Sequence, residues 1–232
     1  MAADVDICNL SLAMLGDVAS ITSIDPPDGS AQSSHCSRFY PIARNALLEM
    51  HSWGFATIRT KLALLAINPS TDPLDPSHST WRYAYIAPSG TTTILEIYDA
   101  ASTDDLSVGV QMANTIPGSF NSGLGNYVPQ PFITETNENG DTVIYSNLEN
   151  ASIRYTLIVD DTTKFPALFI EALSMLLAAH LAGPLIKGKE GRATANQLMN
   201  TFFTWWKKQA IDADSNDRRI KLVPSAPWML NR

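Results

Sequence analysis

Residues 165–184 read FPALFIEALSMLLAAHLAGP and contain the longest apolar run of the chain. Its apolar side chains recur every three or four positions, which predicts a helix with one core-facing side. Pro166 is suited to the first helical position, and Gly183-Pro184 is expected to break or end the helix. Because the run contains Glu171 and His180 and is short, we do not expect it to span a bilayer. The core side is predicted to consist of Leu168, Phe169, Ala172, Leu173, Leu176 and Ala179.

Two helices are expected before the middle of the chain. The first covers about residues 4–15, with Asp4 as its cap and Gly16 closing it. The second covers about residues 30–51, and Pro41 inside it should kink or split it.

A fourth helix is expected over about residues 192–213, after a turn at residues 188–191. It carries two apolar stripes, and one of them can pack on the other helices of the same chain: Ala195, Leu198, Phe202 and Trp205. The second stripe needs a different cover, for which a neighbouring subunit is the natural candidate. The alternative is a central helix that is buried on all sides. The predicted subunit interface consists of Met199, Phe203 and Trp206, with Ala210 continuing the stripe.

The middle of the chain has a different pattern. β-branched or alternating runs predict strands at residues 81–86, 92–98, 132–136, 142–145 and 153–159. Asn139-Gly140 lies in a hairpin turn candidate, since Gly readily adopts positive φ. Residues 115–130 hold three glycines and two prolines, which favours a long loop.

These elements predict an α+β protein. Both chain ends, residues 1–52 and 162–215, are expected to form a four-helix bundle. An antiparallel β domain, residues 53–161, is inserted between the second and third helices. Residues 216–232 are predicted to be an extended C-terminal arm.

The predicted arm combines basic and apolar residues with two prolines. Disordered tails are usually poor in aromatic and branched apolar residues, so this composition favours docking on a partner. The alternative is that the arm folds back on its own domain. The basic root would make charge-assisted contacts and Trp228 would be the main anchor. The predicted docking residues are Arg218, Arg219, Lys221, Leu222, Val223, Trp228, Met229 and Leu230.

Composition limits the function classes. The net charge is −7, which argues against a protein that binds DNA by neutralising its phosphates. The charged fraction of 17% is low for a soluble domain, which favours a surface partly covered by other chains. Cys8 and Cys36 match no metal spacing and are expected to be buried apolar residues. With no signal-peptide pattern, the protein is expected to fold in a cytoplasm.

No catalytic, cofactor or metal motif stands out. The four histidines are scattered singly, and no nucleophile elbow or phosphate loop is present. Residues 212–217 resemble the start of a calcium loop, but Asp217 and Val223 occupy positions that require Gly and Glu. The sequence therefore predicts neither an enzyme nor a cofactor or metal protein.

Several segments taken together resemble a known family. They are ICNLSLAMLG at 7–16, FYPIARNALL at 39–48, HSWGFA at 51–56 with Arg59, WRYAY at 81–85, and the third helix with LAAHLAGPL at 177–185. In order and spacing they resemble the tail tubular protein A, or head-to-tail adaptor, family of short-tailed bacteriophages. Ser52 departs from the pattern, since a proline is expected before Trp53.

The resemblance implies a structural virion protein at the head–tail junction, assembled in the host cytoplasm and attached to no membrane. It implies a homo-oligomeric, dodecameric ring that binds the portal protein above and the nozzle, or tail tubular protein B, below, with tail fibres as a further candidate partner. DNA would pass through the channel without specific binding. The alternatives are another ring-forming head-completion or tail-terminator protein and, less favoured, a tail-associated cell-wall hydrolase.

Overall fold

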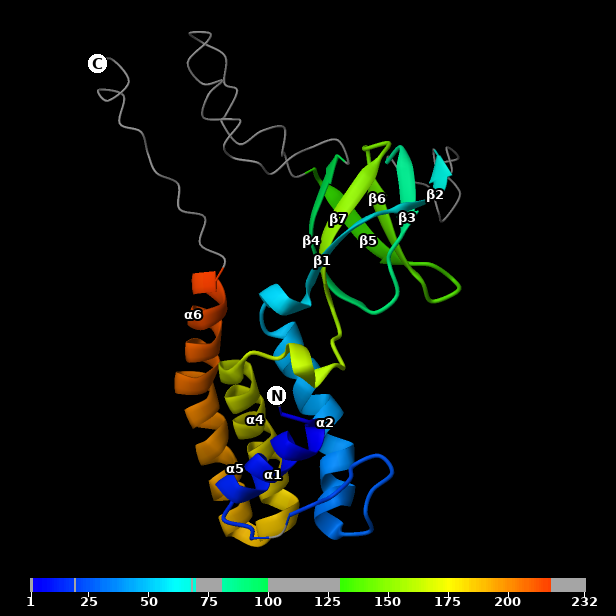
Figure 1. Ribbon diagram of the computed structural model, residues 1–232. Coiled ribbons are helices and arrows are strands. Elements are labelled where there is room, and N and C mark those ends of the chain that lie inside the picture. The colour runs from blue at the N-terminus through cyan, green and yellow to red at the C-terminus, as the bar shows by residue number, and fades with distance from the viewer. Residues whose placement is uncertain (1, 19, 68, 70–80, 100–129, 218–232) are drawn as a thin grey trace, which may run out of the picture. The chain divides into compact units, whose positions relative to one another are not determined.

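The computed structural model describes all residues except 1, 19, 68, 70–80, 100–129 and 218–232 (Figure 1). The protein is α+β and divides into two compact units. A helical unit comes from both ends of the chain, Met1–Phe55 and Val159–Arg232, and a β unit comprises Ala56–Ile158.

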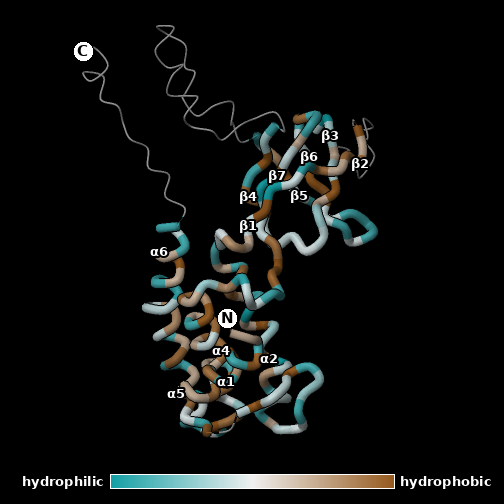
Figure 2. The backbone as a smooth tube through the Cα atoms, viewed as in Figure 1, coloured by the Kyte–Doolittle hydropathy of each residue, from teal (hydrophilic) through white to brown (hydrophobic). Residues whose placement is uncertain are grey.

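The helices of the helical unit pack around one central helix, α4. That helix, Ala167–Ile186, contacts α1, α2, α5 and α6, and most of its length is hydrophobic (Figure 2). Phe169, Leu173 and Leu177 on it are almost fully buried. The other elements of the unit are α1 (Asp4–Met14), α2 (Ala31–Glu49), η2 (Thr162–Lys164), α5 (Gly188–Thr201), the π-turn η3 (Phe202–Trp206) and α6 (Lys207–Asp217).

Both ends of α1 follow from local chemistry. Gly16 adopts φ +76° and its N–H donates to Ala13 O, while Asp17 N–H donates to Leu12 O. These two bonds close the helix as a left-handed glycine cap does. The predicted Asp4 cap is wrong, because Ala3 is the capping residue and the Asp6 carboxylate accepts its N–H at 2.8 Å.

The helix α2 begins where the sequence predicts and continues through its proline. The Ser30 hydroxyl accepts the Ser33 N–H at the start of the helix. Pro41 lies inside one unbroken helix, so of the two expected effects the split is wrong and the kink stays a prediction. Cys36 on α2 and Cys8 on α1 are fully buried, which confirms their prediction as core residues.

The turn between α4 and α5 is shorter than predicted. Helix α4 passes Gly183-Pro184 and ends at Ile186, because a proline so near the end disturbs only the final turn. Positive φ at Lys187 and Gly188 then reverses the chain, and α5 starts at Gly188. Gly191 therefore lies in a helix, where an added Cβ would approach the Ala182 carbonyl oxygen to 3.0 Å.

By length and composition, α4 could cross a membrane, contrary to the expectation that the run is too short. More than half of its most apolar segment is buried inside the protein. In the described residues, those buried side chains face the surrounding helices of the same unit.

The β unit consists of two antiparallel sheets. The three-stranded sheet has the order β1-β7-β4, and the four-stranded sheet has the order β2-β3-β6-β5. The short helix η1 (Gly54–Ala56) precedes them. The strands are β1 (Thr57–Lys61), β2 (Ala63–Ile67), β3 (Tyr83–Ile86), β4 (Thr91–Asp99), β5 (Phe132–Thr136), β6 (Thr142–Ser146) and β7 (Ala151–Leu157).

Residues from both sheets form the core of the β unit. The Tyr85 ring is buried there, and its hydroxyl lies within hydrogen-bond distance of the carbonyl oxygens of Leu148 and Glu149. This satisfies the polar end of a side chain whose ring is enclosed. The buried residues of this core are Leu62, Tyr85, Ile97, Ile144, Ala151, Ile153 and Tyr155.

The five predicted strands are confirmed within a few residues as β3 to β7. The hairpin between β5 and β6 is also confirmed, with Gly140 at φ +86° and the Asn137 side-chain oxygen accepting the Asp141 N–H at 2.7 Å. Strands β1 and β2 were not predicted. The loop predicted over 115–130 lies outside the described residues, except for Gln130, whose N–H donates to Ile97 O.

The imidazole of His180 on α4 is expected to make the stability of the helical unit depend on pH. It stacks on Phe39 of α2 with ring centroids 6.2 Å apart, and burial lowers its pKa below the usual value of 6.5. Protonation is therefore harder in the folded state than in the unfolded chain, so stability should fall as the pH drops through and below about 6.5. We expect H180Q to remove this part of the pH dependence, measured by urea unfolding at pH 7.5 and pH 5.5. The prediction would be contradicted if the free energy of unfolding fell by the same amount between pH 7.5 and pH 5.5 in H180Q and in the unchanged protein.

Candidate interaction surfaces

The last helical segment changes its geometry in the middle. Helices α5 and α6 run on through the π-turn Phe202–Trp206. A π-turn inserts an additional residue, which shifts the side chains that follow relative to an α-helix. From the π-turn onward, the covered positions are Phe202 and Ala210, which are almost fully buried, and Asp214, which is 8% exposed.

This shift changes which aromatic residues face outward. Trp205, predicted for the inner stripe, is 58% exposed, and Phe203 is 50% exposed. Trp206, predicted for the outer stripe, is half-buried, as is Met199. We name Phe203 and Trp205 the aromatic pair. The predicted interface thus contains one exposed residue and two half-buried ones, and sequence reasoning assigned Trp205 to the wrong side.

Local contacts accompany the π-turn and the aromatic pair. The Thr201 hydroxyl donates to Gln197 O at 2.9 Å and the Thr204 hydroxyl donates to Asn200 O at 2.8 Å. In a helix, such a hydroxyl competes with a backbone N–H for the same carbonyl oxygen. The Phe203 ring packs edge-on against Phe202 and receives the Lys207 ammonium at 5.5 Å. Neighbouring residues therefore hold the Phe203 ring, which remains half-exposed.

Asp214 anchors the end of α6 to the chain that leaves α2. Its Oδ1 accepts the Gly54 N–H at 2.7 Å, and its Oδ2 lies 3.1 Å from His51 Nε2. The side chain is almost fully buried, so these partners compensate for its lost hydration. The sequence offers no signal for this contact, because residues 51–54 and 214 are far apart in the chain and come close only in the folded structure.

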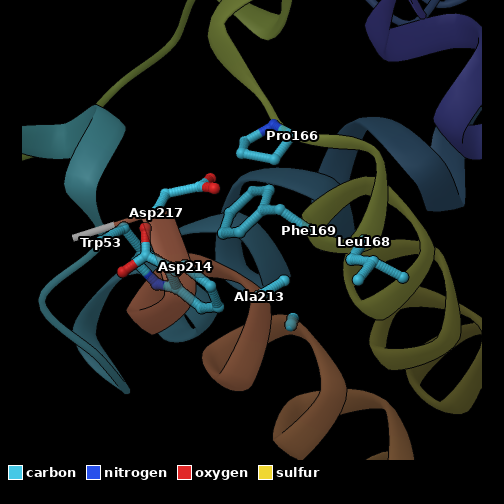
Figure 3. Close-up of a pocket in the computed structure, with 8 residues that line it drawn as sticks. Trp53, Pro166, Leu168, Phe169, Ala213, Asp214 and Asp217 are labelled. Carbon is cyan, nitrogen blue, oxygen red and sulfur yellow. The ribbon is translucent and has the colours of Figure 1, made fainter. Parts of the chain in front are cut away.

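Near Asp214 lies a cluster of aromatic rings, of which Figure 3 shows Trp53 and Phe169. The Trp53 indole N–H donates to Leu47 O at 2.9 Å, and its ring meets Phe169 edge-on with centroids 5.0 Å apart. Phe55 and Phe165 also contact Phe169. The pocket beside Trp53 and Phe169 holds about 30 Å³, which is room for little more than a water molecule. This cluster is therefore a packed core and offers no space for a small-molecule ligand.

Replacing Asp214 with alanine should destabilise the helical unit. It removes the acceptor of the Gly54 N–H and the partner of His51, and hydrogen bonds to charged groups each contribute about 1.5–3 kcal/mol. We expect D214A to lower the free energy of unfolding by about 2–3 kcal/mol, followed by helical circular dichroism in urea. D212A, at an exposed position of the same helix, is the matched control. Equal stability of the two variants would contradict the anchoring role.

A concavity in the β unit also offers no charged group for acid–base chemistry. It encloses about 300 Å³ and is lined by residues of β4, β5 and β6, including Thr92, Phe132 and Thr142. No side chain lining it carries a charge near neutral pH. Among the described residues, no three His, Cys, Asp or Glu side chains are grouped so that they could hold a metal ion.

The predicted docking residues Arg218, Arg219, Lys221, Leu222, Val223, Trp228, Met229 and Leu230 lie outside the described residues. Helix α6 extends to Asp217, so the start of the predicted arm is corrected: Asn216 and Asp217 are helical.

Comparisons with protein-family models find none that matches this chain, and a search of curated proteins finds no relative. The exposed surfaces of the two units are therefore the basis for a functional proposal.

Proposed function

We propose that this chain is a structural virion protein: a ring-forming head-to-tail adaptor that joins the portal to the tail nozzle of a short-tailed phage. In this proposal, its helices form a four-helix bundle in which α5, η3 and α6 act as one long helix. The ring, of twelve copies as the resemblance implies, continues the DNA channel and performs no catalysis.

The observation that carries the proposal is the aromatic pair. Phe203 and Trp205 are at least half-exposed on a segment whose other side is buried. Large apolar surface of this kind commonly marks a contact with another chain. A closed ring requires each copy to offer two different lateral surfaces, and the aromatic pair would supply part of one.

The sequence resemblance supports the same proposal. Its segments belong to α1, α2, the chain around Trp53, β3 and α4, so they include both the central helix and the aromatic cluster. The net charge of −7 supports a channel wall that DNA passes without binding.

Truncation after Asp217 tests the proposed portal contact. Cutting there keeps α6 and the Asp214 contacts intact, whereas cutting after Asp214 would remove the last turn. We expect the truncated protein to stay folded, with unchanged helical circular dichroism, but no longer to co-sediment with purified portal. We expect the full-length variant W228A to bind portal at least tenfold more weakly, because aromatic anchor residues contribute much of the binding energy of an interface.

Full portal binding by the truncated protein would place the docking surface elsewhere. Loss of fold on truncation would assign residues 218–232 to the core of their own unit. Ring formation by the full chain without portal binding would favour the alternative, another ring-forming head-completion or tail-terminator protein.

A further inference from the structure

The four-stranded sheet ends on two outer strands. Its order is β2-β3-β6-β5, so β2 and β5 are the outer strands, and each contains five residues (Figure 1). Among the described residues, neither outer edge pairs with a further strand. An unpaired edge presents a row of backbone donors and acceptors to which another strand can add.

The β2 edge is apolar and exposed. Its sequence is ALLAI, and Figure 2 shows it in the colours of hydrophobic residues. Leu64, Leu65 and Ile67 are 48%, 53% and 63% exposed. Edge strands that stay unpaired usually carry charges or proline, and β2 has neither.

The β5 edge has an apolar end and an acidic end. Phe132 and Ile133 lie at its start, and Glu135 lies near its end, next to the hairpin that carries Glu138 and Asp141. The strand registers place these ends relative to β2. Across the sheet, Ile67 is level with Tyr83, Ser146 and Phe132, and Ala63 is level with Ile86, Val143 and Glu135.

We propose that β2 of one copy pairs with β5 of the next copy, so that the four-stranded sheet continues from subunit to subunit. Each neighbouring pair in the sheet is antiparallel, so β2 and β5 run in opposite directions. Copies placed side by side in the same orientation therefore bring β2 and β5 together as an antiparallel pair. This inference rests on the proposed ring, and it assigns one of its lateral contacts to the β unit.

The level register pairs apolar residues across the proposed contact. Ile67 of one copy lies opposite Phe132 of the next, a half-buried residue that also packs against the core of its own unit. Apolar cross-strand pairs of this kind stabilise sheets.

A two-fold pairing of β2 with β2 is the competing arrangement. It would also cover the apolar edge, but it requires opposite orientations of the two copies and leaves β5 open. It ends as a dimer, whereas the β2–β5 contact is heterologous and repeats until a ring closes. The two arrangements therefore predict different cross-links.

Cysteine cross-linking tests the pairing in the full chain, alone and with purified portal added as a template. Leu64 is level with Thr134 through Tyr85 and Ile144, so L64C and T134C are the positions to join. The native Cys8 and Cys36 are fully buried and serve as the unreactive background. We expect the double variant to give a ladder of covalent oligomers with a short bismaleimide, and L64C mixed with T134C to give covalent dimers.

Each outcome decides the proposal. Efficient cross-linking of L64C alone would replace it with the two-fold contact. If light scattering detects oligomers of the double variant but no cross-links form, the β2–β5 pairing is wrong and the proposed ring remains possible. Absence of both oligomers and cross-links, with portal present, would overturn the pairing and the proposed function together.

Discussion

Replacing Phe169 with alanine is expected to lower the free energy of unfolding of the helical unit by about 3–5 kcal/mol. The Phe169 ring is 1% exposed on the central helix α4. It contacts the rings of Trp53, Phe55 and Phe165 with centroids 4.8–5.0 Å apart. Its removal leaves a cavity that the neighbouring helices cannot fill, and the contacts of three aromatic rings are lost together.

The neighbouring residue provides a matched control for this prediction. Leu168 is 37% exposed on the same turn, so L168A should cost about 1 kcal/mol or less. Urea unfolding followed by helical circular dichroism measures both variants. Equal losses would mean that the aromatic cluster is not the packed centre of the helical unit. Since domains are stable by only about 5–15 kcal/mol, F169A would also be expected to express poorly.

A negative charge on the aromatic pair should abolish assembly and leave the subunit folded. In the proposed ring, F203D or W205D would place a carboxylate in an apolar contact, where burying an unpaired charge is strongly unfavourable. Because both side chains are at least half-exposed in the free subunit, its own stability should change by less than about 1 kcal/mol. Light scattering and electron microscopy, with portal present, measure the loss of rings.

T204D separates the position from the charge. Thr204 is exposed between the two aromatic residues, so this variant adds the same charge to the same turn. We expect it to assemble far better than F203D or W205D. Normal assembly of both aromatic variants would show that the pair does not form a contact between copies. Unfolding of either variant would mean that its ring belongs to the core.

The sequence predicts most of the secondary structure because most elements have regular periods. The apolar run of α4 and the β-branched runs of β3 to β7 mark these elements in the sequence, although α4 is buried on all sides and not on the single core-facing side that its spacing predicts. Strands β1 and β2 were not predicted, for a physical reason. No turn residue separates them, since the chain passes from one sheet to the other at the buried Leu62, and ALLAI shows no alternation.

The interaction surfaces were harder to predict. Spacing rules assume a constant helical period, and the π-turn at Phe202–Trp206 violates that assumption where the aromatic residues lie. The anchor between Asp214 and Gly54 joins positions 160 residues apart, which only the fold brings together. The position of β2 as an outer strand depends on sheet order, which the sequence does not reveal.

Negative-stain electron microscopy of the full-length protein, alone and mixed with the portal protein of the same phage, tests the proposed adaptor function most directly. We expect rings with a central channel attached to one face of the portal, formed either by the protein alone or on the portal as a template. Portal particles that stay bare, with no rings of the protein in either preparation, would contradict the account.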